Sequence, residues 1–93
     1  MKILRCRIET GPTKMPKGEI LKVGYFQGPC AWILTDENAP LIDRNIQLFR
    51  ESLDEVTPNG FYLGSYVASI IDHPGDGRVR EVSYFVYEWM VNP

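Results

Sequence analysis

The sequence predicts an α+β fold, with a mainly antiparallel sheet of about five strands, one helix packed on one face, and the element order β-β-β-α-β-β. In several short segments apolar residues alternate with polar ones, which is the period of a half-buried strand. In residues 39–56 they recur every three or four positions, which is the period of an amphipathic helix. The chain has 93 residues, of which 44% are hydrophobic, so it has room for a single domain over residues 1–93.

The first strand is predicted at residues 2–9, KILRCRIE. Leu4, Cys6 and Ile8 alternate there with charged side chains, so one face is expected to be buried and the other solvated. Residues 10–18, TGPTKMPKG, contain two prolines and two glycines among polar residues. This composition disfavours regular structure and predicts a loop.

A hairpin is predicted next, from residues 19–26, EILKVGYF, and residues 30–35, CAWILT. Leu21, Val23 and Tyr25 are expected to share one side of its first strand. The intervening QGPC places a glycine before a proline, which is typical of a tight turn.

The helix is predicted at residues 39–56, APLIDRNIQLFRESLDEV. Pro40 suits the first helical turn, and Pro58 with Gly60 suits the end of the helix. We expect the helix to pack its apolar stripe on the sheet. The stripe consists of Ile42, Ile46, Phe49, Leu53 and Val56, and its expected contacts on the sheet are Leu4, Cys6, Val67 and Val82.

Two long segments at residues 61–71 and 79–91 are rich in aromatic and β-branched residues and predict a second hairpin. Between them, DHPGDG supplies the proline and the glycines of a turn. The expected register pairs Ile71 with Arg78 and assumes that no bulge interrupts the strands; a one-residue bulge would exchange the faces. The face that the helix is expected to cover then consists of Leu63, Val67, Ile71, Val82, Tyr84 and Val86.

The other face of this hairpin gathers aromatic side chains, with Gly64 opposite Phe85. One helix covers one face of a small sheet, so these rings need another cover or stay open to solvent. Tyrosine and tryptophan are common anchors of binding surfaces. We therefore predict a face that binds a protein partner or a second copy of this chain, made of Tyr62, Tyr66, Phe85, Tyr87 and Trp89. The alternative is that the rings complete the chain's own core, under a curled sheet or under residues 10–18.

A single-stranded nucleic-acid binder is a second function class open to these residues, because bases stack on exposed rings. The phosphate contacts would come from Arg5, Arg7, Lys14 and Lys17. Residues 1–22 carry a net charge of +4, and the whole chain carries −2. The acidic balance favours a protein partner over nucleic acid.

An enzyme is the third function class, and the sequence does not favour it. The chain contains no P-loop, GxSxG or HExxH motif, and its one histidine, His73, lies in a predicted turn. Cys6 and Cys30 have no further ligands near them at metal-binding spacing. We therefore predict no catalytic residue, no metal and no cofactor. Charges interrupt each apolar run of the first residues, so we expect neither a signal peptide nor a membrane segment, and a cytoplasmic protein.

Overall fold

The computed structural model describes residues 1–52, 57–58, 60–73, 75 and 77–89. In this part of the chain the regular structure is entirely β-strand, and no helix is found. The strands are β1 (Lys2–Arg7), β2 (Gly11–Pro16), β3 (Gly18–Tyr25), β4 (Pro29–Thr35), β5 (Leu41–Arg50), β6 (Phe61–His73) and β7 (Arg78–Trp89). The predicted α+β class is therefore wrong, and the described chain has an all-β fold.

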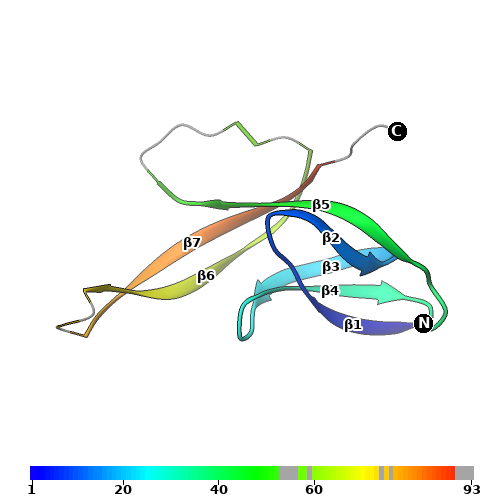
Figure 1. Cartoon of the computed structure of the whole chain (residues 1–93), viewed down its shortest axis with the longest axis horizontal. Coiled ribbons are helices and arrows are strands. Elements are labelled where there is room, and N and C mark those ends of the chain that lie inside the picture. Colours follow the sequence, from blue (N-terminus) through cyan, green and yellow to red (C-terminus); the bar gives the residue numbers. More distant parts are fainter. Residues whose placement is uncertain (53–56, 59, 74, 76, 90–93) are drawn as a thin grey trace.

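The seven strands form two antiparallel sheets that pack against each other (Figure 1). One sheet has three strands in the order β1-β4-β3, and the other has four strands in the order β2-β5-β7-β6. The β6–β7 hairpin contains the two longest strands and extends past the end of the three-stranded sheet (Figure 1). Each sheet therefore has an inner face against the other sheet and an outer face that points away from it.

An apolar core lies between the two inner faces. Its buried members are Ile8, Val23, Ala31 and Ile33 beside or within the three-stranded sheet, and Met15, Ile46, Tyr66, Ala68 and Val86 in the four-stranded sheet. Cys6 packs against this core and Ile8 is buried in it, so the alternation predicted for residues 2–9 is confirmed. Burial raises the pKa of the Cys6 thiol, with a smaller contribution from the nearby Cys30.

The predicted helix is replaced by strand β5, whose first half pairs with β2 and whose second half pairs with β7. Ile46 is fully buried, but Phe49 lies opposite Phe85 on the outer face, so the predicted apolar stripe is divided between two faces. The two neighbouring strands give β5 backbone partners along its length, and such pairing overrides a local helical pattern. The expected contact with Val67 is also wrong, because that side chain is exposed. Leu53 and Val56 lie outside the described residues.

The loop predicted at residues 10–18 contains strand β2. Thr13 and Met15 are buried, whereas the alternate residues Pro12 and Lys14 are exposed. The burial therefore alternates as in a half-buried strand. The two prolines in the sequence favour a loop instead, which is why the strand was not predicted. The sheet pairs β2 with β5 only, so β2 is an edge strand, where a proline is tolerated because its missing N–H can face away from the partner.

The hairpin of β3 and β4 confirms the prediction for residues 19–35. Its register shifts at a bulge between Ile20 and Lys22, so Leu21 is exposed while Val23 is buried. The expectation that Leu21 and Val23 share one side is therefore wrong, because one inserted residue moves the following side chains to the opposite face.

The β6–β7 hairpin confirms the second predicted hairpin, but its register shifts at a bulge between Tyr62 and Gly64 and again between Ile71 and His73. The predicted pairing of Ile71 with Arg78 is therefore wrong, and Ile71 pairs with Val79. Gly64 has a φ of 146°, and a Cβ at this position would lie 2.9 Å from the Val23 side chain of β3. Glycine therefore permits both the unusual backbone angle and the close approach of the two sheets.

The bulge exchanges the faces of β6 but not those of β7. Val82 and Val86 point into the core as predicted. Tyr66 also points into the core, whereas Val67 and Ile71 are exposed, which reverses the predicted faces for these three residues. Within one strand pair, a single inserted residue has moved an aromatic ring from the outer face to the inner face.

Tyr66 is 8% exposed and its ring stacks on that of Tyr84, with 5.2 Å between the ring centroids. Burial, followed by the phenols of Tyr84 and Tyr25, raises the pKa of Tyr66 to about 12. In the unfolded chain this phenol ionises near the ordinary value of about 10. Between about pH 10 and pH 12 the folded state therefore holds an extra proton, and folding stability falls as pH rises through this window.

We expect the wild-type chain to lose about 2–3 kcal/mol more stability between pH 9.5 and pH 12 than the Tyr66→Phe variant, which lacks the buried phenol. Urea denaturation at several pH values measures this difference. Equal losses for both chains would show that Tyr66 ionises normally in the folded state.

Candidate functional site

Aromatic side chains from three adjacent strands share the outer face of the four-stranded sheet. Directly opposed residues of antiparallel strands lie on the same face, which defines the membership of this group. The opposed pairs are Phe49 with Phe85, Gln47 with Tyr87, Asn45 with Trp89, and Tyr62 with Tyr87. We call the set Phe49, Tyr62, Phe85, Tyr87 and Trp89 the aromatic face.

Three rings of the aromatic face contact one another, and the face remains partly open to solvent. Tyr87 lies at the centre, with its ring centroid 5.8 Å from that of Phe49 in an edge-to-face arrangement and 5.3 Å from that of Tyr62. Tyr62 is 55% exposed, Trp89 45% and Phe85 39%. Neither a curled sheet nor residues 10–18 cover these rings, so the aromatic face does not complete the core between the sheets.

A hollow of about 210 Å³ opens on the aromatic face between Phe49, Phe85 and Tyr87. Residues 50–52 and Pro58 also line it. An apolar hollow with a polar border is the shape that receives an anchoring side chain at a protein interface.

The aromatic face differs from the predicted set at two positions. Tyr66 belongs to the core, because the β6 bulge turns it inward. Phe49 joins the outer rings, because β5 is a strand and its residue 49 lies opposite Phe85. A strand reading of residues 41–50 would have placed Phe49 with the other odd-numbered residues on this face.

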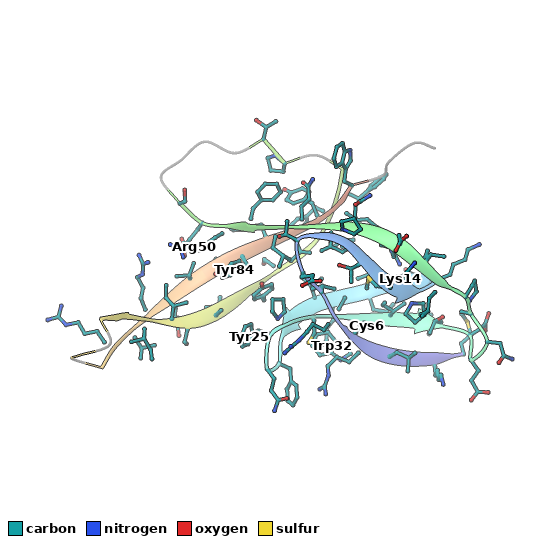
Figure 2. All side chains as sticks on the ribbon, viewed as in Figure 1. Cys6, Lys14, Tyr25, Trp32, Arg50 and Tyr84 are labelled. Carbon is teal, nitrogen blue, oxygen red and sulfur yellow. The ribbon has the colours of Figure 1, made fainter. Side chains whose placement is uncertain are left out.

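The four cations of the nucleic-acid alternative are not brought together on the aromatic face. Arg5 and Arg7 lie on the outer face of the three-stranded sheet, opposite Trp32 and Cys30 of β4. Lys14 lies on the outer face of the four-stranded sheet, but its ammonium group is 3.1 Å from the Asp43 carboxylate. Figure 2 shows Lys14 and Trp32 on different sheets. Lys17, the fourth cation, lies between β2 and β3.

A second hollow, of about 320 Å³, lies beside Lys17 and the charged pair of Arg44 and Glu88. The Arg44 guanidinium donates to both Glu88 carboxylate oxygens, from Nε at 2.5 Å and from Nη2 at 2.6 Å. Its Nη1 donates to the Gly18 carbonyl oxygen at 2.8 Å, which joins the two sheets. These groups bond to each other, so the charge of each is compensated by its partner.

Comparisons with protein-family models, with curated proteins and with solved structures found no match to this chain. Among the described residues, no helix is long and apolar enough to span a membrane. The same residues contain no cluster of three His, Cys, Asp or Glu side chains placed to hold a metal ion.

Proposed function

We propose that this chain is a non-enzymatic protein-binding domain that self-associates through its aromatic face. The observation that carries the proposal is a group of five aromatic side chains, three of them 39–55% exposed, on a sheet face that the other sheet does not cover. Soluble proteins rarely leave contiguous apolar surface of this kind open unless it forms contacts.

The charge of the aromatic face supports a second copy of the chain as the occupant. In the described strands, the charged side chains at outward positions of this sheet are Lys14 and Asp43, which pair with each other, and Glu81 towards the hairpin end. Arg50 and Glu51, which have opposite charges, line the hollow on this face. Ser65, Ser83, Asn45 and Gln47 supply uncharged polar groups around the rings. A nearly neutral face repels a copy of itself little, and it offers few cations to a nucleic acid.

The exposed apolar area of this face is a large part of what a standard protein interface buries. An aromatic side chain buries about 150–250 Å² when fully covered, so the open parts of five rings with the neighbouring Val67, Ile71 and Val79 amount to several hundred Å². A standard interface buries about 800 Å² on each partner. Two copies related by a two-fold axis would bring the same face to both sides of the contact.

We expect Trp89→Ala to weaken self-association by at least about 2 kcal/mol, which is roughly a thirtyfold loss, because Trp89 is an exposed aromatic anchor in this face. Sedimentation equilibrium or light scattering over a concentration series measures the dimer dissociation constant. Phe26→Ala is the matched control. Phe26 is about as exposed as Trp89, at 49% against 45%, but it follows β3 in the other sheet and is not part of the aromatic face.

The control variant should dimerise as the wild-type chain does. A wild-type chain that stays monomeric up to about 1 mM would overturn the proposal, since a dimer weaker than that is worth less than about 4 kcal/mol. Equal weakening by Trp89→Ala and Phe26→Ala would also contradict it, because the contact would then not be specific to the aromatic face.

A further inference from the structure

On the outer face of the three-stranded sheet, one aromatic side chain lies between two cations. Arg5 of β1 lies opposite Trp32 of β4, and Lys22 of β3 lies opposite Trp32 from the other side. Neighbouring strands are about 4.8 Å apart, so the three residues form one line across the sheet, about 10 Å from the first Cα to the last. Figure 2 shows Trp32 on this sheet, away from the strands of the aromatic face.

Both cations lie over aromatic rings. The Lys22 ammonium group is 4.6 Å from the Trp32 ring centroid, and the Arg5 guanidinium carbon is 3.9 Å from the Phe26 ring centroid. A Cβ at Gly24 would lie 3.1 Å from the Trp32 ring, so the indole extends along the sheet surface over this glycine. These contacts orient the cations on the sheet surface, where they are held by rings instead of carboxylates.

Arg7 adds a third cation to this surface, two residues and about 7 Å along β1 from Arg5. Its guanidinium donates to the Gln27 carbonyl oxygen in the β3–β4 turn, next to Phe26. In the described part of the chain, no ion pair joins Arg5, Arg7 or Lys22 to a carboxylate. We call Arg5, Arg7, Lys22, Phe26 and Trp32 the basic face. Glu19 lies one row beyond Trp32 in the sheet.

We propose that the basic face binds single-stranded nucleic acid: Lys22 and Arg5 move from over the Trp32 and Phe26 rings onto phosphates, which Arg7 also holds, and bases stack on the rings that these cations leave. The combination of aromatic side chains with cations that have no carboxylate partner is the surface that single strands require, since stacking takes any base and the cations follow the backbone. Guanidinium planes also stack on bases, so Arg5 can serve both purposes. The site is separate from the aromatic face and does not depend on self-association.

The charge and shape of the basic face favour a single strand over an acidic peptide. A peptide carboxylate would use the cations but would offer no flat ring to stack on Trp32 and Phe26. A duplex keeps its bases stacked inside and does not offer them to a sheet surface. A single strand offers phosphates and open base planes together, which matches both parts of the basic face.

The test is fluorescence anisotropy of a labelled oligothymidylate of twelve nucleotides, titrated with the full chain at about 50 mM salt. We expect Lys22→Gln and Trp32→Ala each to weaken binding at least tenfold. With three cations engaged, the logarithm of the binding constant should fall with the logarithm of salt concentration with a slope of about −2, and Lys22→Gln should reduce that slope by about 0.7. Lys22 is exposed, so its variant keeps the fold even if Trp32→Ala does not.

Lys14→Gln is the matched control, because it removes an exposed cation from the other sheet, and it should bind as the wild-type chain does. In a Trp89→Phe background Trp32 is the one remaining tryptophan, and stacking on it should quench its fluorescence on binding. Absence of oligothymidylate binding at 100 µM protein would overturn the proposal. So would equal loss in Lys22→Gln and Lys14→Gln, or full competition by an oligoglutamate of equal charge, because these results would show attraction by net charge alone.

Discussion

Arg44→Ala is expected to lower the free energy of unfolding by about 3–5 kcal/mol, as measured by chemical denaturation. The side chains of Arg44 and Glu88 are each 13% exposed, and the guanidinium bonds both carboxylate oxygens and the Gly18 carbonyl oxygen. Removing Arg44 leaves the Glu88 carboxylate enclosed without a counter-charge and removes a bond between the two sheets. The cost comes mainly from the charge left behind and not from the lost attraction.

A double variant separates these two contributions. Arg44→Met combined with Glu88→Leu removes both charges and keeps apolar volume, so it should recover most of the stability lost by either single change. Lys14→Ala breaks the ion pair with Asp43, in which both side chains are more than 60% exposed. This variant should lower the free energy of unfolding by less than about 1 kcal/mol. If Arg44→Ala cost no more than Lys14→Ala, the Arg44–Glu88 pair would not be a buried link between the sheets.

Ile46→Ala should cost about 2–5 kcal/mol, whereas Phe49→Ala should cost only about 1 kcal/mol in the monomer. Ile46 has no exposed surface and lies in the core between the sheets, so its truncation leaves a cavity. Phe49 is half-buried on the outer face of the same strand, where solvent fills the space that the ring leaves. Denaturation at low protein concentration, where self-association does not contribute, measures both values.

The comparison of these two variants distinguishes a strand from a helix at residues 41–50. On a helix, Ile46 and Phe49 would lie on one stripe and lose similar amounts of stability on truncation. Leu41→Ala, at the exposed start of β5, is the control and should change stability by less than about 0.5 kcal/mol. A loss at Phe49 equal to or larger than the loss at Ile46 would contradict the strand.

Most of the aromatic face could be predicted from the sequence, because it depends on the parity of residues within β7. Phe85, Tyr87 and Trp89 are two residues apart, so any straight strand places them together. Tyr66 could not be placed in the same way, because the bulge before Gly64 reflects the space available against Val23 in the other sheet. The basic face was also not predicted, since Arg5 and Lys22 meet at Trp32 only when β1 and β3 flank β4.

The sequence by itself determined the strand at residues 2–7, the two hairpins and the grouping of aromatic residues on β7, because these features depend on alternation and on turns between neighbours in the chain. Only the tertiary structure decided that residues 41–50 form a strand. Ile42 and Ile46 are four residues apart, which places them on one face in a helix and in a strand alike. Arg44 lies between them and breaks the apolar alternation of a strand. Its partner Glu88, partly buried, makes a charged residue tolerable at this position, and it lies 44 residues away in β7. No local pattern contains that partner, so the choice depends on contacts that exist only once the two sheets have assembled.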